Sequence, residues 1–220
     1  RETVSIANDG LTVRLDKDFP RVVDYTLNQK VMKGAKLSYD YVTINTVDMA
    51  AEASIIAQDD RSVTYHVTPD AAKTGVTFDV KFTVLEDQIL EMLILNVHEP
   101  EDELVYSIGL PKQPLISADS TQADAMLDAS YVNKNNRHFA DLHKSIANKE
   151  ISANDPVSVM IPVITADGLS ASMYNNVMIG GDEFVYQAFT LADGEVTVGV
   201  WNTDFMYRGV DGEKILPFPS

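Results

Sequence analysis

Hydrophobic and polar residues alternate with a period of two along several stretches of the chain. From residue 76 to 84, apolar side chains occupy the even positions and polar side chains the odd ones. The same alternation runs through residues 63–68 and 195–201. A period of two gives a strand one apolar face and one polar face. These three stretches therefore predict half-buried β-strands.

Further strand-sized stretches are apolar or alternating, and they are residues 3–6, 11–15, 21–27, 41–47, 53–58, 89–97, 104–110, 157–165, 169–175 and 185–191. Among them, residues 89–97 are apolar on both faces except for Glu91 and Asn96. This composition predicts a central strand that is covered on both sides.

Turn signals separate many of these stretches. Asp-Gly pairs stand at Asp9-Gly10, Asp167-Gly168, Asp193-Gly194 and Asp211-Gly212. Such pairs supply the positive φ angles that two-residue hairpin turns require. Helical periodicity is weak: one short stripe, spread over residues 139–146, lies within a polar stretch from about 118 to 154 that we expect to be irregular.

Many short strands, hairpin turns and no strand–helix–strand rhythm predict an all-β fold. We expect a large antiparallel double-sheet β-sandwich with at most one or two short helices. The 220 residues contain 45% hydrophobic residues and show no linker or internal repeat. Sandwiches of this length often form one unit, so we predict a single domain over residues 1–220.

Composition and charge exclude several classes of binding partner and of chemical site. Seventeen Lys and Arg against 33 Asp and Glu give a formal charge of −16, which argues against nucleic acid and anionic lipid as partners. The absence of cysteine excludes disulfides, thiolate metal sites and a cysteine nucleophile. No apolar run approaches the roughly 18 residues of a membrane span. Because the chain opens at Arg1 without a leader, we expect a processed protein or a piece of a larger one.

Few residues point to catalysis or metal binding. No nucleophile elbow, phosphate loop, calcium loop or zinc motif occurs. His66 falls on the polar side of its strand, which favours a surface histidine. His98 begins an acidic loop whose composition is typical of a solvated segment. The alternative is that this loop binds a single structural calcium ion. His138 and His143 are five residues apart, which does not suit two ligands on one helical face. We expect no cofactor.

Carbohydrate binding is the function that residue chemistry leaves open, because sugar faces stack on aromatic rings. The candidates for sugar contact are Trp201, Tyr174, Tyr186 and His66. The competing interpretation is that these rings pack in the core or at sheet edges, where aromatics are common. We favour packing, since Trp201 ends a regular strand and is the single tryptophan.

Several motifs in a fixed order resemble one family. They are LDKDFPRVVDY (15–25), IGLP (108–111), LISADS (115–120), PVITADGLSASMYNN (162–176), YRG (207–209) and LP (216–217). This arrangement resembles the β-sandwich domain that precedes the catalytic barrel in endo-α-N-acetylgalactosaminidases, glycoside hydrolase family 101. The resemblance spans nearly the whole chain.

The resemblance implies a galactose-mutarotase-like supersandwich fold. It also implies a parent enzyme that is bacterial, extracellular or attached to the cell surface, and that releases Gal-β-1,3-GalNAc from Ser or Thr of mucin-type O-glycans by a retaining mechanism. The catalytic carboxylates of such enzymes lie in the barrel, so no catalytic residue is carried over to this chain. The implied role is a non-catalytic module that packs against the barrel of the same polypeptide and borders the glycan cleft.

Two alternatives stay open at this stage. One is a free-standing carbohydrate-binding module. The other is an active aldose 1-epimerase, in which His66 would act with a partner such as Glu91 or Glu195. Fold alone does not decide between them.

Some motif residues also have plain structural roles. We expect Arg21 to form an exposed ion pair, worth about 0–1 kcal/mol. We expect Arg208, Tyr207 and Phe218 to contact the neighbouring domain, because an arginine forms bidentate carboxylate bonds and the last residues are strongly apolar.

Overall fold

The computed structural model describes residues 1–34, 39–70, 72–102, 105, 107–110, 116–133, 135–152, 154–155, 159–173, 185–192 and 195–204. For residues 160, 185–192 and 198–204 the description covers the backbone. In this part of the chain nearly all regular structure is strand, and the one helical element is the 3-10 turn η1 (Glu86–Gln88). The all-β prediction is confirmed.

The strands of the first half are β1 (Thr3–Asn8), β2 (Leu11–Asp16), β3 (Val22–Leu27), β4 (Lys30–Lys33), β5 (Tyr41–Ile44), β6 (Val47–Gln58), β7 (Ser62–Pro69), β8 (Thr77–Leu85) and β9 (Ile89–His98). The strands of the second half are β10 (Ser107–Gly109), β11 (Ile116–Asp119), β12 (Met126–Val132), β13 (Phe139–Ser145), β14 (Met160–Ala166), β15 (Leu169–Ser172), β16 (Val185–Ala192) and β17 (Glu195–Asp204).

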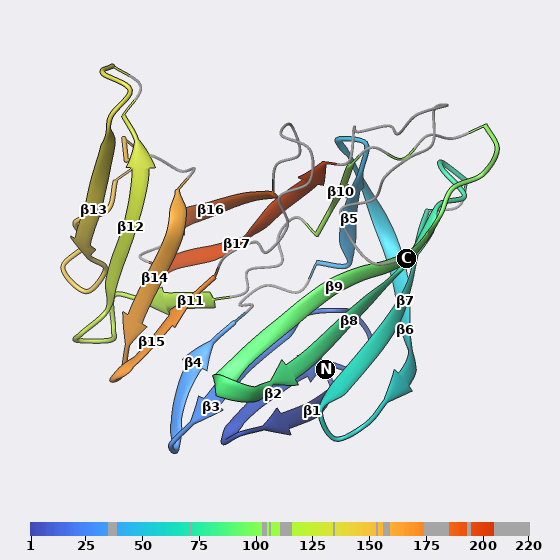
Figure 1. Cartoon of the computed structure of the whole chain (residues 1–220), viewed down its shortest axis with the longest axis horizontal. Coiled ribbons are helices and arrows are strands. Elements are labelled where there is room, and N and C mark those ends of the chain that lie inside the picture. The colour runs from blue at the N-terminus through green and yellow to red at the C-terminus, as the bar shows by residue number, and fades with distance from the viewer. Residues whose placement is uncertain are drawn as a thin grey trace.

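One long antiparallel sheet runs through most of the molecule. Its order is β1-β2-β3-β4-β11-β17-β10-β5-β6-β7-β8-β9, with β16 paired to β17. The sheet curls so that β1 and β2 lie against β7 and β8 (Figure 1). Strand β17, late in the sequence, therefore connects the group β1–β4 to the group β5–β9, through its neighbours β11 and β10.

A smaller sheet has the order β13-β12-β14-β15. It stands at the side of the molecule away from β6–β9 and approaches β4, β11 and β16 (Figure 1). Its inner face carries Leu127, Leu142 and Ile164, which are buried.

Two hydrophobic cores follow from this arrangement. The first lies between the β1–β3 and β6–β9 parts of the long sheet and contains the alternating residues of β8, such as Phe78, Val80 and Phe82. The second lies beneath the smaller sheet, where Leu127 and Ile164 pack with Met32 of β4 and Val196 of β17. The ring of Tyr25 packs against both cores.

Two predicted hairpin turns are confirmed. Asp9 and Gly10, between β1 and β2, have φ angles of 49° and 81°, and Asp167 and Gly168, between β14 and β15, have 52° and 76°. The other two Asp-Gly pairs lie outside the described residues. The stretch 41–47, predicted as one strand, is instead a hairpin, because Asn45 and Thr46 both take positive φ angles and turn β5 into β6.

Three expectations about individual segments are wrong. Strand β9 is not central: among the described residues it pairs with β8 alone. The stripe at 139–146 is strand β13 rather than a helix, because it pairs along its length with β12. The polar stretch 118–154, which was expected to be irregular, contains the hairpin of β12 and β13. Small residues such as Ala129 lie on the buried side of this hairpin.

Candidate functional site

His66 lies near the middle of β7, on the side of the strand that faces away from the first core. Thr64 and Thr68 share that side and are half-buried like His66, while Tyr65 and Val67 on the opposite side are fully buried. The position predicted from the alternation is confirmed. We therefore take the neighbourhood of His66 as the first candidate site.

Asp79 of β8 holds the imidazole of His66. The two residues are paired across the strands, and His66 Nδ1 lies 2.7 Å from Asp79 Oδ1. Asn96 of β9 donates from Nδ2 to Asp79 Oδ2 over 2.8 Å. The side chain of Asp79 is 8% exposed and that of His66 is 41% exposed. Three neighbouring strands thus present an oriented imidazole at the surface.

This arrangement orients a histidine, but it does not place a glutamate beside it. A carboxylate on one ring nitrogen fixes the tautomer and leaves Nε2 for a ligand or a proton. Glu91 pairs with Thr83, four positions along β8 from Asp79 and so about 13 Å away along the strand. Glu195 begins β17, which pairs with β10, β11 and β16 and not with β7. Neither glutamate proposed from the sequence is brought opposite His66.

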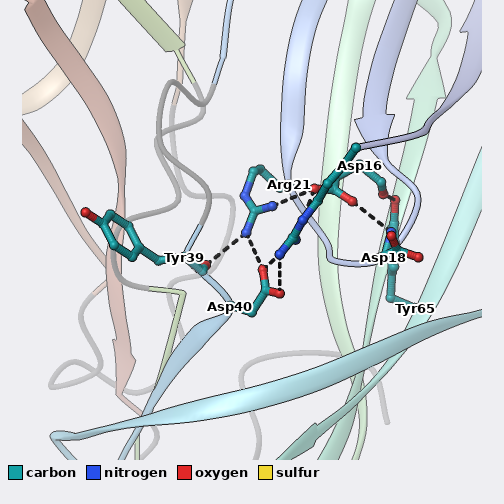
Figure 2. Close-up of polar contacts among 7 residues, drawn as sticks. Asp16, Asp18, Arg21, Tyr39, Asp40 and Tyr65 are labelled. Atoms are coloured by element: carbon teal, nitrogen blue, oxygen red, sulfur yellow. Dashed lines mark hydrogen bonds and ion pairs between the residues drawn. The ribbon is translucent and has the colours of Figure 1, made fainter.

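A second cluster of charged groups lies where β2 ends (Figure 2). The guanidinium of Arg21 donates from Nη1 to Asp16 Oδ2 at 2.6 Å and from Nη2 to Asp40 Oδ1 at 2.7 Å. Nη2 also donates to the carbonyl oxygen of Tyr39 at 2.9 Å. Arg1 donates to both carboxylate oxygens of Asp40, at 2.8 and 2.7 Å. We call Arg1, Asp16, Arg21 and Asp40 the arginine network.

The arginine network is buried at its centre. The side chains of Arg21 and Asp16 are 3% and 5% exposed. Ion pairing of Arg21 was predicted correctly, but the prediction of an exposed pair is wrong. The guanidinium of Arg21 lies over the ring of Phe19, 5.2 Å from its centroid, and Phe19 is fully buried in the first core, so the pair is shielded from solvent.

Electrostatics in the network favour the charged forms. The hydrogen bonds from Arg1, and then those from Arg21, lower the pKa of Asp40. The hydrogen bonds to Asp40 in turn raise the pKa of Arg1. The hydroxyl of Tyr65 donates to the Asp16 carbonyl oxygen at 2.5 Å, and burial raises its pKa. The network therefore fastens β2, β5 and β7 together and presents no reactive group of its own.

The aromatic candidates are described only in part. The backbones of Tyr186 and Trp201 lie in β16 and β17, where a shift in the pairing between Val185 and Gln187 sets Tyr186 opposite the 201–202 segment. The remaining candidates lie outside the described residues, and they are Tyr174, Tyr207, Arg208 and Phe218. Their proposed contacts stay predictions.

Other polar clusters suit structure better than catalysis. His143 of β13 contacts Asp128 of β12 on an exposed sheet face, and this contact raises the pKa of His143. Within the described ranges, no group of three or more His, Cys, Asp or Glu is arranged to hold a metal ion. The described residues also contain no helix that is long and apolar enough to cross a bilayer.

The sequence alone did not predict the residues that hold His66 and Arg21 in place. Asp79 was visible as a polar-face residue of an alternating strand, but its pairing with His66 depends on the register of the β7–β8 hairpin. Asn96 reaches Asp79 because a bulge in the β8–β9 pairing gives it a φ of 51°. Asp40 lies 19 residues from Arg21, and no local pattern joins them.

Comparison with known proteins places the chain in a family. The profile of the family described as "Galactose mutarotase-like fold domain" matches residues 6–217. A protein of Renibacterium salmoninarum named "Putative endo-alpha-N-acetylgalactosaminidase" is 24% identical over 234 aligned positions, which cover 98% of this chain. The alignment covers only 15% of that relative's length. Both findings support the resemblance drawn from the motifs.

Proposed function

Because the chain belongs to the family of galactose mutarotase-like fold domains, we propose that it is a non-catalytic β-sandwich module of an endo-α-N-acetylgalactosaminidase. In this proposal the module packs against a catalytic barrel of the same polypeptide and supports it. The parent enzyme is extracellular or attached to the bacterial surface and releases Gal-β-1,3-GalNAc from mucin-type O-glycans.

The proposal that the module is not catalytic rests on the environment of His66. In mutarotation a histidine acid and a glutamate base act on the same sugar ring, so both must reach it. In the described part of the chain, His66 is tied to Asp79, and neither Glu91 nor Glu195 lies opposite it. A family fold does not by itself bring the family's chemistry.

The extent of the similarity supports the assignment to a larger enzyme. Nearly the whole chain aligns with the Renibacterium protein, yet the aligned part is a small fraction of that protein. This is the relationship expected between a module and a multidomain hydrolase.

Two measurements test the proposal. We expect the purified chain to release no disaccharide from an aryl α-glycoside of Gal-β-1,3-GalNAc, and to leave the mutarotation rate of fresh α-galactose at the buffer value. We also expect it to co-purify with a separately expressed barrel domain of a homologous enzyme and to raise the thermal midpoint of that barrel.

The His66→Ala variant serves as the control for the epimerase alternative. If the chain accelerates the decay of optical rotation and His66→Ala abolishes this effect, the chain is an enzyme and the proposal is wrong. Failure to bind or stabilise the barrel would reject the supporting role.

A further inference from the structure

Strand β9 lies at one end of the long sheet, beside β8 (Figure 1). It is ten residues long, and in the described part of the chain it pairs with β8 alone. Its second edge therefore presents a row of backbone N–H and C=O groups without a neighbouring strand among the described residues. Residues 89–95 pair with β8 without interruption, and the bulge at Asn96 comes after them. The open edge is thus regular over most of its length.

The side chains of β9 are apolar on both faces of the strand. Met92 and Ile94 lie toward the first core. Leu93 and Leu95 lie on the outer face, where they are half-buried. Glu91 is the only Asp, Glu, Lys or Arg of the strand. This composition is typical of a strand in the interior of a sheet, although β9 lies at the end of one.

Two other edge strands of the described structure have features that discourage pairing. β13, at the edge of the smaller sheet, carries Asp141, His143 and Lys144 within seven residues. β1, at the other end of the long sheet, has six residues, and its Ala7 amide donates to the Asp60 carbonyl oxygen at 2.8 Å. Charged side chains and short strands are common means of preventing pairing at a sheet edge. β9 is longer and has one such charge, which favours an edge that binds another strand.

We propose that β9 pairs with β9 of a second copy of this chain, antiparallel and about a two-fold axis at Leu93. The partner of an open edge is itself an extended strand with unpaired backbone groups. A second copy meets this requirement, and a single two-fold contact then satisfies both open edges, whereas any other strand would satisfy only one of them. The long sheets of the two copies become one continuous sheet.

The register of this pairing follows from the faces of β9. Residues that lie opposite each other in an antiparallel pair share a face, so outer residues of β9 meet outer residues of the copy. A pairing centred on Leu93 places this residue against itself and Glu91 against Leu95 of the copy. The two Glu91 carboxylates are then farther apart than in a register centred on Met92, which would set Glu91 opposite Leu93.

The test is sedimentation equilibrium of the whole chain from micromolar to millimolar concentration, in salt that screens the repulsion between two chains of charge −16. We expect the average mass to rise from that of one chain toward that of two. Leu93→Lys should weaken the association at least about fivefold, because two lysines then face each other.

Leu95→Lys provides a matched control on the same face of β9. It changes the charge of the chain by the same amount as Leu93→Lys, but it sets a lysine opposite Glu91 of the copy. Because opposite charges across a strand pair attract, this variant should associate at least as tightly as the unmodified chain. Circular dichroism and urea midpoints close to those of the unmodified chain would show that both variants are folded.

Hydrogen exchange of the unmodified chain gives a measurement that needs no substitution. Backbone amides of residues 89–95 should exchange more slowly at high protein concentration than at low concentration, because the open edge becomes hydrogen-bonded. Amides of β13 should exchange at the same rate at both concentrations.

Four outcomes would overturn the inference. They are a mass of one chain at every concentration, equal association of Leu93→Lys and the unmodified chain, a loss in Leu95→Lys as large as in Leu93→Lys, and exchange at residues 89–95 that does not depend on concentration. None of these measurements involves the barrel, so the supporting role of the module would stand or fall separately.

Discussion

Arg21 shows how one side chain can fix the relative positions of distant segments. Its guanidinium contacts Asp16 at the end of β2 and Asp40 just before β5, and it also binds a backbone carbonyl oxygen. Burying charges is costly, so such a group stabilises the fold only when its partners stay in place. Removing one partner leaves the others buried and uncompensated.

We therefore predict that Arg21→Met lowers the free energy of unfolding by about 3–5 kcal/mol, as measured by urea denaturation. Lys17→Ala is the control, because the Lys17–Glu2 pair is exposed at both ends. Its loss should change the stability by less than about 1 kcal/mol. Similar losses for the two variants would contradict the role assigned to burial.

Asp119 gives a prediction for acid pH. Hydrogen bonds from Thr121 and Lys33 lower the pKa of Asp119 to about 2, from 3.8. A carboxyl whose pKa is depressed by folding stabilises the folded state above its unfolded pKa and loses this contribution as the pH falls toward the folded value. In Asp119→Asn, the urea midpoint should therefore fall less steeply between pH 4 and pH 2 than in the unmodified chain.

Lys33→Met should reduce the same pH dependence only in part, because Thr121 still donates to the carboxylate. Superimposable pH curves for the unmodified chain and Asp119→Asn would contradict this account.

Local sequence patterns predicted which face a residue occupies, but not its partner. The alternation in β7 placed His66 on the polar side correctly. Its contact with Asp79 depends on strand register, and the Arg21–Asp40 contact depends on how a loop returns to the sheet. Pairings of this kind arise from the tertiary fold, so alternation alone does not specify them.

At the scale of elements, strands with strong alternation and Asp-Gly turns were predicted well. The hairpin at Asn45-Thr46 was missed because neither residue is glycine, although asparagine adopts positive φ more readily than most residues. Strand β9 was misplaced because its two-faced apolar composition is typical of a central strand, whereas it lies at the end of the sheet order.

Two glycines allow a comparison of turn and packing effects. Gly10 has a φ of 81° and open space around its missing side chain, while a Cβ at Gly34 would lie 2.5 Å from the Val22 carbonyl oxygen. Gly10→Ala should destabilise the chain by about 1–2 kcal/mol through backbone strain alone. Gly34→Ala should cost about 3 kcal/mol or more, because backbone atoms must move.

Urea denaturation of the two glycine variants checks this order. A larger loss for Gly10→Ala would show that the β1–β2 turn, rather than the approach of β4 to β3, is the more demanding position.

At the scale of the whole molecule, the two cores belong to one continuous structure. Tyr25 packs against both, and β4, β11 and β17 of the long sheet form the floor of the second core. A substitution in one core should therefore lower the stability of the whole fold.

Leu127→Ala tests this coupling. Leu127 is fully buried in the second core, so its truncation should cost about 2–5 kcal/mol. We expect the urea midpoint to fall equally by far-UV circular dichroism and by the fluorescence of Trp201, the single tryptophan, because unfolding is cooperative. A shift seen by circular dichroism but not by fluorescence would mean that the smaller sheet unfolds by itself.

The position of β17 between β11 and β10 has a consequence for how the protein is made. On a ribosome, a chain that has emerged only as far as β16, at Ala192, lacks the strand that joins the two parts of the long sheet. Contacts between segments so far apart in sequence form slowly and leave sheet edges unpaired in the meantime. Assembly of the long sheet is therefore completed only after Asp204 has been added, and until then the edges of β10 and β11 that pair with β17 are open to pairing with another chain.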